Sequence, residues 1–357
     1  NGDSNGKIRS LKTGKVVDIN GRDFRFRPDT GEIETEAGRT QYGRSRDDTG
    51  NWFGSNNSNP GWHYALDERY LRRNPHVITP GQKVALPKVA SVGPVFPISK
   101  TLSRFNDYNA ANRFTSACGL SIYRDEFLGK GYYGNSFICE PVHNLVRREV
   151  VTPTGVTFSS RQPDDEIGTE FFASTDNWSR PTFARTGPDG ALYIVDMYRQ
   201  AIEHPQWIPQ DWQRKLNLRD GHDKGRIYRI APIDKPRRLV PRLDRLNSRE
   251  LVAALESPSG WQRDTVQQLV IERRDKTAIP ILKKLITDSR QPLARMQALC
   301  VLDGLNAVDE AILAIALKDS HAAVRRHAIR LSEPLLDRSE SLFDQVVSLE
   351  NDSDAMV

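Results

Sequence analysis

The chain has 357 residues, of which 38% are hydrophobic and 27% are charged, and its formal net charge is +5. This composition is typical of about two globular domains, each able to bury a core. We expect no transmembrane segment, because no run of about 18 apolar residues occurs. We also expect no nucleic-acid partner, because the mild positive charge forms no stripe interleaved with aromatic residues.

Residues 1–232 show the pattern of short strands bounded by glycine, proline, asparagine and aspartate. A three-part motif recurs in this region: a glycine, an aromatic residue three positions later, and a polar residue three positions after that. Its copies are Gly50-Phe53-Asn56, Gly134-Phe137-Glu140 and Gly190-Tyr193-Asp196. Recurring sheet units of this kind are typical of propeller blades. We therefore predict an incomplete all-β propeller over residues 1–232, with about three to four four-stranded blades and the N-terminal blades missing.

Residues 233–246 form a charged, proline-containing stretch that we interpret as a linker. From residue 247 the apolar residues follow the i, i+3, i+4 spacing of amphipathic helices. The sequence around Asp288, Ser289 and Arg295 recurs about 30 residues later around Asp319 and Arg325. Helix pairs at this period stack as a solenoid, so residues 247–357 are predicted to be an all-α, HEAT-type solenoid.

Common cofactor and nucleophile motifs are missing from the sequence. The three cysteines form no CxxC or CxxCH, so this chain carries no zinc knuckle and no c-type haem attachment site. It has no G-x-G-x-x-G, no P-loop and no G-x-S-x-G, which disfavours nucleotide cofactors and serine hydrolysis.

Several long stretches resemble one known family. They are residues 21–26 (GRDFRF), 28–33 (PDTGEI), 46–60 (RDDTGNWFGSNNSNP), 73–76 (RNPH), 115–119 (TSACG), 137–144 (FICEPVHN), 185–193 (RTGPDGALY), 196–199 (DMYR) and 203–205 (EHP). Together they resemble the family named membrane-bound dehydrogenases in planctomycetes and verrucomicrobia. In that family a propeller distantly similar to soluble quinoprotein glucose and sorbosone dehydrogenases precedes HEAT repeats, and a c-type cytochrome domain usually follows.

The resemblance implies a function for the whole protein. It predicts an extracytoplasmic dehydrogenase, periplasmic or on the cell surface, that oxidises a sugar or related alcohol. A quinone similar to PQQ and Ca²⁺ would be its cofactors, and electrons would pass to a cytochrome c domain elsewhere on the full chain. The alternative is a non-catalytic propeller and HEAT module that binds glycans or proteins.

Candidate site residues follow from the ends of the repeated strands, where propeller loops converge on a central channel. Carboxylate and amide oxygens at these ends are candidate Ca²⁺ ligands: Asn56, Glu140 and Asp196. The loops that follow supply candidate general bases, His63 and His143, and candidate cofactor-binding residues, Asn59, Tyr198 and Arg199. We expect this set to gather on one side of the propeller; the alternative is that its members make local turn bonds and structural contacts.

Two cysteines fall in one predicted hairpin, whose turn is rich in glycine. If Tyr123 pairs with Gly134, Cys118 lies opposite Cys139, at a Cα separation that a disulfide can span. An exported protein would keep such a bond. The alternative is two free, buried thiols that pack as small apolar side chains. Cys300 is expected to be free in both cases.

Overall fold

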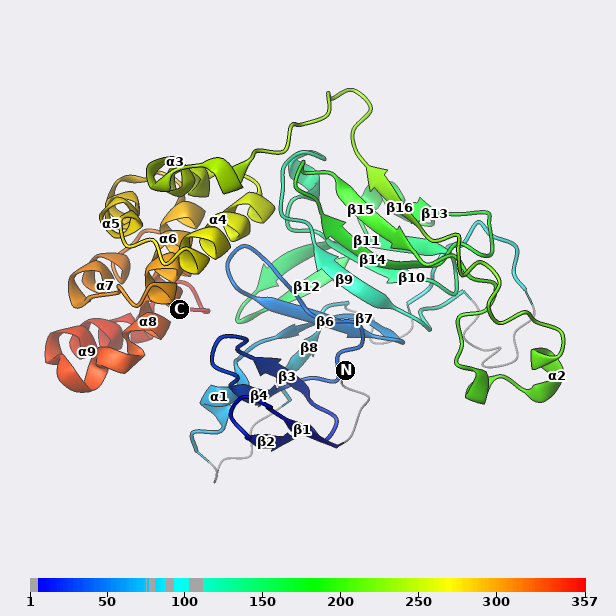
Figure 1. Cartoon of the computed structure of the whole chain (residues 1–357), viewed down its shortest axis with the longest axis horizontal. Coiled ribbons are helices and arrows are strands. Elements are labelled where there is room, and N and C mark those ends of the chain that lie inside the picture. The colour runs from blue at the N-terminus through cyan, green and yellow to red at the C-terminus, as the bar shows by residue number, and fades with distance from the viewer. Residues whose placement is uncertain (1–5, 75, 77–80, 88–92, 103–111) are drawn as a thin grey trace. The chain divides into compact units, whose positions relative to one another are not determined.

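A computed structural model describes residues 6–74, 76, 81–87, 93–102 and 112–357 of the chain (Figure 1). The chain divides into two compact units. The first, here called the sheet unit, comprises Asn1–Tyr123, Gly131–Thr186 and Leu192–Ala231. The second, here called the helical unit, comprises Arg124–Lys130, Gly187–Ala191 and Pro232–Val357.

In its described residues, the sheet unit contains two hairpins and three larger antiparallel sheets. The hairpins pair β1 (Lys7–Arg9) with β2 (Val16–Asp18), and β3 (Asp23–Phe26) with β4 (Ile33–Glu36). The first larger sheet has the order β5 (Ser45–Arg46), β6 (Trp52–Asn56), β7 (Asn59–Tyr64), β8 (Lys83–Ala85). The short helix α1 (Glu68–Leu71) lies between β7 and β8 in the sequence.

The other two larger sheets repeat this up-and-down order. One contains β9 (Cys118–Ile122), β10 (Ser136–Glu140), β11 (Leu145–Thr154) and β12 (Thr157–Arg161), with β13 (Phe172–Ala173) also paired to β11. The last contains β14 (Pro181–Thr186), β15 (Leu192–Asp196) and β16 (Arg226–Ile230), and helix α2 (Gln210–Gln213) lies in the β15–β16 connection.

The three copies of the sequence motif occupy equivalent places in these sheets. Each copy lies on the second strand of its sheet, and its polar residue is the last residue of that strand: Asn56 in β6, Glu140 in β10 and Asp196 in β15. The motif glycines turn the chain into the strand at positive φ, namely 92° at Gly50, 78° at Gly134 and 82° at Gly190. The motif therefore marks one structural position three times, although the described strands do not close into a barrel or propeller.

Strand β9 connects the larger sheets. The Ile122 backbone N–H donates to Ser45 Oγ at 3.0 Å, and the Cys118 thiol donates to the Thr182 carbonyl oxygen at 3.5 Å. A Cβ atom at Gly119 would lie 2.4 Å from that same Thr182 oxygen, and Gly119 has a φ of +58°. Only glycine fits here, so the close approach of β9 and β14 depends on the missing side chain.

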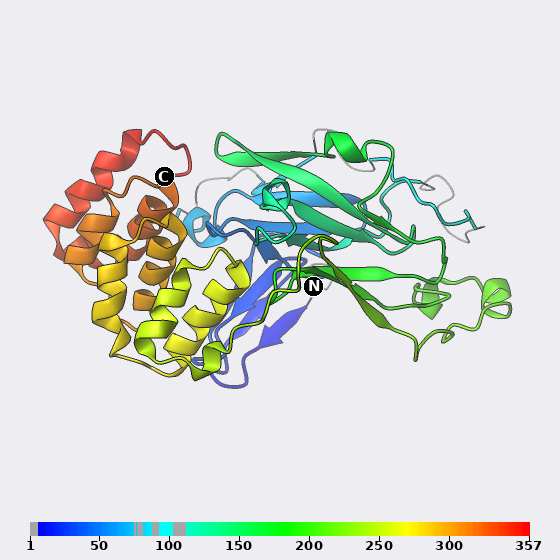
Figure 2. The ribbon, with the colours of Figure 1, turned by 90° about the horizontal axis from the view of Figure 1, so that it is seen from above.

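The helical unit contains seven α-helices in its described residues. They are α3 (Ser248–Ala253), α4 (Gly260–Glu272), α5 (Ala278–Asp288), α6 (Pro292–Gly304), α7 (Glu310–Ala316), α8 (Ala322–Ser332) and α9 (Glu340–Val347). Packing joins α4, α6 and α8 in one row and α5, α7 and α9 in another, and Figure 2 shows them as neighbouring rods from yellow to red. Their shared core is apolar and includes Leu251, Leu282 and Leu299, each 0% exposed.

Three arginines repeat one contact along these helices. Each donates a hydrogen bond to the backbone carbonyl six residues earlier: Arg263 to Ser257 (2.6 Å), Arg295 to Ser289 (2.9 Å) and Arg325 to Asp319 (2.7 Å). Arg295 also pairs with the Asp319 carboxylate, and Arg325 pairs with Asp352, both at 2.6 Å. The recurrence seen in the sequence thus corresponds to a repeated contact between successive helix pairs.

The stretch predicted as a linker makes ionic contacts inside the helical unit. Arg238 Nη1 lies 2.9 Å from both oxygens of Asp125, which is fully buried, and Lys235 Nζ donates to the Phe127 carbonyl at 3.0 Å. These bonds attach residues 235–238 to the short segment 124–130.

The order of antiparallel sheets followed by helices, predicted from the sequence, is confirmed. Among the residues that the structure describes, none of the helices is long and apolar enough to cross a membrane.

Candidate functional site

Glu140, predicted as a metal ligand, ends β10 with its carboxylate fully buried. Its Oε2 accepts the backbone N–H groups of Thr115 (3.1 Å) and Ser116 (3.0 Å). Its Oε1 accepts the Ser116 hydroxyl and lies 3.2 Å from Nδ1 of His143. The carboxylate thus holds the residues that lead into β9, the first strand of its own sheet.

Asp196 makes the equivalent arrangement at the end of β15. Its Oδ1 accepts the backbone N–H groups of Arg180 (2.6 Å) and Tyr198 (2.9 Å), and its Oδ2 accepts the Ser179 hydroxyl at 3.0 Å. Ser179 and Arg180 lead into β14, again the first strand of the same sheet. Both carboxylates therefore fasten the start of a sheet to the end of its second strand.

Asn56 has a smaller role at the end of β6. Its Oδ1 accepts the backbone N–H of Asn59 at 3.0 Å, while Asn59 Oδ1 accepts the N–H of Gly61 at 3.2 Å. These are turn bonds of the kind that asparagine side chains make in tight hairpins.

The two histidines proposed as general bases are both buried and hydrogen-bonded. Nε2 of His143 accepts the backbone N–H of Asn112 at 3.0 Å, and Nδ1 lies 3.2 Å from Glu140 Oε1. Nδ1 of His63 lies 3.0 Å from Thr157 Oγ1, and the ring packs between Phe53 and Phe158 at centroid distances of 5.4 and 4.9 Å. Neither ring lies at a surface where it could reach an incoming alcohol.

Arg199 and Tyr198, proposed to bind a cofactor, contact the chain itself. The Arg199 guanidinium donates to four backbone carbonyl oxygens, those of Met197 (3.1 Å), Tyr198 (2.9 Å), Gly221 (2.5 Å) and His222 (3.4 Å). The Tyr198 ring lies under the Arg226 guanidinium, with the Arg226 Cζ atom 4.1 Å from the ring centroid. These contacts order the loop after β15.

Most of the predicted residues do lie in one connected region, the ends of β6, β10 and β15. Backbone and side-chain bonds link these ends: Ala117 N–H to the Asn57 carbonyl (2.9 Å), Arg180 Nη1 to the Pro141 carbonyl (2.9 Å), and Asn144 Nδ2 to the Ser179 carbonyl (2.6 Å). We call this region the strand-end network. His63, which lies inside β7, is not part of it.

Cys118 lies opposite Cys139 as predicted, but not through the uniform register that a Tyr123–Gly134 pair would set, because Ile122 pairs with Ser136 and a bulge follows. Cys118 pairs with Cys139 across β9 and β10, and both are buried free thiols in the structure, so the disulfide stays a prediction. Burial raises the pKa of both thiols, and the neighbouring Cys139 adds to the rise at Cys118.

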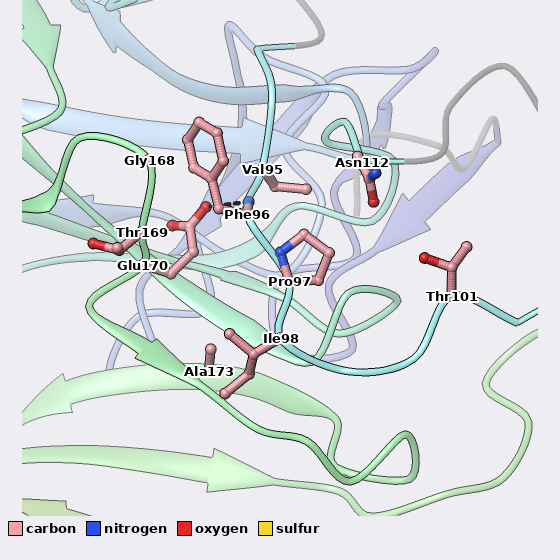
Figure 3. Close-up of a pocket in the computed structure, with 10 residues that line it drawn as sticks. All are labelled: Val95, Phe96, Pro97, Ile98, Thr101, Asn112, Gly168, Thr169, Glu170 and Ala173. Carbon is pink, nitrogen blue, oxygen red and sulfur yellow. Dashed lines mark hydrogen bonds between the residues drawn. The ribbon is translucent and has the colours of Figure 1, made fainter.

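A pocket that no sequence motif indicated is drawn in Figure 3, and one of its lining residues, Asn112, donates its backbone N–H to His143. The volume of the pocket is about 590 Å³, within the range of small-molecule sites. It is lined by Val95, Phe96, Pro97, Ile98, Thr101, Asn112, Gly168, Thr169, Glu170 and Ala173. These residues come from several separated segments, which explains why sequence spacing gave no signal for the pocket.

A buried ion pair holds the pocket wall in place. Glu170, whose side chain is 0% exposed, accepts Arg147 Nε at 2.7 Å and Nη2 at 2.5 Å, and its Oε1 also accepts the Phe96 N–H at 2.9 Å. Arg147 Nη2 donates further to the Pro94 carbonyl at 2.9 Å. His143 fixes the opposite wall through the N–H of Asn112.

Among the described residues that line the pocket, the chemistry is neutral. Both oxygens of Glu170, the charged residue of the lining, already accept hydrogen bonds from the chain. Thr101, Asn112 and Thr169 add hydroxyl and amide groups, and Val95, Ile98 and Ala173 add apolar surface. Such a lining suits a small uncharged molecule that carries hydroxyl groups.

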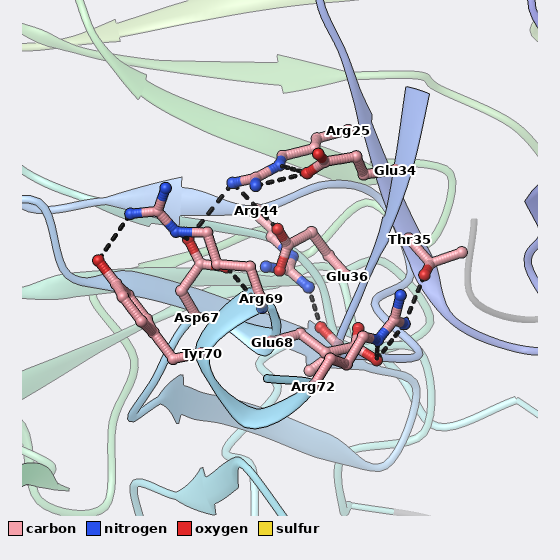
Figure 4. Close-up of polar contacts among 11 residues, drawn as sticks. Arg25, Glu34, Thr35, Glu36, Arg44, Asp67, Glu68, Arg69, Tyr70 and Arg72 are labelled. Atoms are coloured by element: carbon pink, nitrogen blue, oxygen red, sulfur yellow. Dashed lines mark hydrogen bonds and ion pairs between the residues drawn. The ribbon is translucent and has the colours of Figure 1, made fainter. Parts of the chain in front are cut away.

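A second polar cluster, drawn in Figure 4, joins the β3–β4 hairpin to α1. Arg25 pairs with Glu36 (3.1 Å) and Asp67 (3.3 Å), and Arg72 Nε donates to Glu68 at 2.9 Å. Burial, together with the charge of Asp67, raises the pKa of Glu36. Because each of these carboxylates lies against an arginine, the cluster works as a structural ion network.

Within the described part of the chain, no group of three or more histidine, cysteine, aspartate or glutamate side chains is placed to hold a metal ion. The fold and site define a chain of antiparallel sheets with a strand-end network and a small pocket, followed by packed helices. Residues 1–234 match the family described as Domain of unknown function (DUF7133), and the chain belongs to that family. No curated protein and no solved structure matches the chain.

Proposed function

We propose that this chain is a non-catalytic, ligand-binding portion of an extracytoplasmic protein. One observation carries the proposal: the carboxylates and histidines suited to chemistry are hydrogen-bonded within the chain, whereas a preformed neutral pocket lies beside them. A catalytic base must reach the proton that it abstracts, and buried, engaged groups are poorly placed to do so.

The proposal includes the finer architecture. We interpret the three larger sheets as blades of an incomplete β-propeller and the helices from residue 247 as a HEAT-type solenoid. The equivalent positions of Asn56, Glu140 and Asp196 support the first interpretation, because blades repeat one up-and-down unit. The repeated arginine contact of Arg295 and Arg325 supports the second.

The ligand class in this proposal is a small sugar or related alcohol. Hydroxyl groups of such a ligand would bond to Thr101, Asn112 and Thr169, and its C–H surface would pack on Ile98 and Ala173. Phosphates, carboxylates and amines fit less well, because the Glu170 carboxylate is already neutralised by Arg147.

Binding measurements with a panel of neutral sugars and polyols test this directly. Saturation-transfer NMR and calorimetry on the purified chain should detect at least one neutral polyol, and sugar acids and amino sugars should bind less well. Thr101→Val should weaken binding about fivefold to tenfold for the lost hydrogen bond, and Ala173→Leu should block the pocket. Thr154→Val, at the exposed end of β11, is the matched control. Absence of any polyol binding, or binding that ignores both pocket variants, would reject the proposal.

The oxidoreductase function is the second candidate, and the family resemblance favours it. It predicts a quinone, Ca²⁺ and electron transfer to a cytochrome c domain on the full chain. Quinone and Ca²⁺ added to this chain, followed by dye reduction with the same sugars, distinguish the two candidates. We expect no dye reduction; sugar-dependent reduction lost in His143→Gln but retained in Thr154→Val would favour the second candidate.

A further inference from the structure

The hairpin of β9 and β10 contains a bulge that changes its register. Ile122 pairs with Ser136, and Ser121 pairs with Phe137. If this register continued, Gly119 would lie opposite Cys139. Instead β9 has one extra residue before the next pair, which brings Cys118 opposite Cys139.

Gly119 makes this bulge possible. Its φ of +58° is the left-handed conformation typical of the glycine in one bulge type. The contact with the Thr182 carbonyl leaves no room for a Cβ atom. The Cys118–Cys139 pairing is therefore set by a specific backbone feature of β9.

Directly opposed residues in antiparallel strands have Cα atoms about 4.5 to 5.5 Å apart and side chains on the same face. A disulfide needs a Cα separation of roughly 4.4 to 6.8 Å. From this juxtaposition we propose that Cys118 and Cys139 are joined by a disulfide bond when the protein folds in an oxidising compartment. In the structure Cys118 donates its S–H to the Thr182 carbonyl at 3.5 Å, so this side chain must turn toward Cys139 for the bond to form.

The step is a two-electron oxidation. Two S–H bonds break and one S–S bond forms, and the two protons and two electrons pass to the disulfide of an oxidant such as oxidised glutathione, which becomes two thiols. Exchange requires a thiolate at the surface, but Cys118 is 3% and Cys139 is 0% exposed. The bond must therefore form while the hairpin is still open, before the sheet unit closes over it.

Refolding under two redox regimes tests both parts of the proposal. In the first, the denatured, reduced chain refolds with oxidised glutathione; in the second, it refolds with reductant, and the oxidant is added after folding. Free thiols are then alkylated in denaturant without reduction. Tryptic peptides 114–124, 131–147 and 296–318 carry Cys118, Cys139 and Cys300, respectively.

We expect peptides 114–124 and 131–147 to be linked in the first regime, with peptide 296–318 alkylated. The second regime should leave most of the pair alkylated over the same time. Cys300→Ser is the matched control and should keep the link, and the linked chain should melt several degrees higher than the reduced chain. Alkylation of both Cys118 and Cys139 after oxidative refolding, or a link from either to Cys300, would overturn the disulfide. Linkage of the already folded chain at the same rate would overturn the proposed timing.

Discussion

The sheet unit and the helical unit satisfy their carboxylates with different partners. The sheet unit buries Glu140 and Asp196, at 0% and 1% exposure, and surrounds them with backbone N–H groups and hydroxyls. The helical unit fills most of its core with apolar side chains, and its carboxylates pair with arginines. The fully buried Asp125 pairs with Arg238, and Asp319 and Asp352, whose side chains are 9% and 7% exposed, pair with Arg295 and Arg325. In the sheet unit the buried acids bind the backbone of the loops that lead into β9 and β14, which would otherwise bury unpaired N–H groups.

This comparison matters for function. A buried carboxylate at the end of a strand that recurs from sheet to sheet has the sequence context of a metal ligand, yet here it satisfies donors that would otherwise be unpaired. Loss of activity on mutating such a residue would therefore report misfolding unless stability is measured for each unit. Pulsed hydrogen–deuterium exchange across a urea series gives that readout, because peptides from the two units are separate.

The largest effect that we predict is for the buried ion pair of the pocket wall. Glu170→Ala leaves the Arg147 guanidinium buried without its main partner and should lower the free energy of unfolding of the sheet unit by about 3 to 5 kcal/mol. The exposed pair of Arg161 and Asp164 is the control, and Asp164→Ala should cost less than about 1 kcal/mol. Equal effects of the two variants would contradict the claim that buried acids hold this unit together.

Two glycines with similar backbone angles sharpen the comparison further. Gly119→Ala should destabilise the sheet unit by about 3 kcal/mol, because the new methyl group meets the Thr182 carbonyl as well as adopting a positive φ. Gly155, at φ +60°, has open space around it, and Gly155→Ala should cost only about 1 kcal/mol. The difference between the two losses of unfolding free energy measures the close approach of β9 and β14. Equal losses would mean that Gly119 does not pack against Thr182.

A smaller effect is expected in the helices. Arg295→Ala removes the pairing with Asp319 and the bond to the Ser289 carbonyl, and should lower helical-unit stability by about 1 to 2 kcal/mol. Lys284→Ala, which removes an exposed contact to Asp288, should change it by less than about 0.5 kcal/mol. Neither variant should alter the exchange of peptides from the sheet unit.

Acidification should affect the two units in opposite directions by a small amount. Burial raises the pKa of Glu149 and Glu166 in the sheet unit. Their charged forms therefore destabilise this unit at neutral pH, and this destabilisation is relieved as the pH falls through the raised pKa values. In the helical unit, hydrogen bonds lower the pKa of Asp275 and of Asp309, which pairs with Lys283. Their stabilisation is present above about pH 4 and is lost as pH falls through the lowered pKa. The urea midpoints of the sheet unit and of the helical unit should therefore move apart between pH 7 and pH 3. Parallel changes of the two midpoints would contradict these assignments.

The sequence predicted the repeated element well, because the glycine, aromatic and polar motif is local. The partners of its polar residue could not be predicted in this way. Glu140 bonds to Thr115 and Ser116 in the preceding loop, and no spacing rule connects them. The pairing of Cys118 with Cys139 was predicted, but the bulge at Gly119 that produces this pairing was not indicated by the pattern. The pocket was missed for the same reason, since Thr101, Asn112 and Ala173 meet only through the folded sheets.

The most direct measurement of the central claim is the stability of Asp196→Ala in EDTA and in Ca²⁺. If Asp196 holds the start of β14, the variant loses the acceptor for Arg180, Tyr198 and Ser179, and the sheet unit should lose about 3 kcal/mol in both conditions. If Asp196 is instead a calcium ligand, Ca²⁺ will stabilise the unmodified chain and not the variant. A loss that appears only when Ca²⁺ is present would contradict the structural role proposed for the strand-end carboxylates.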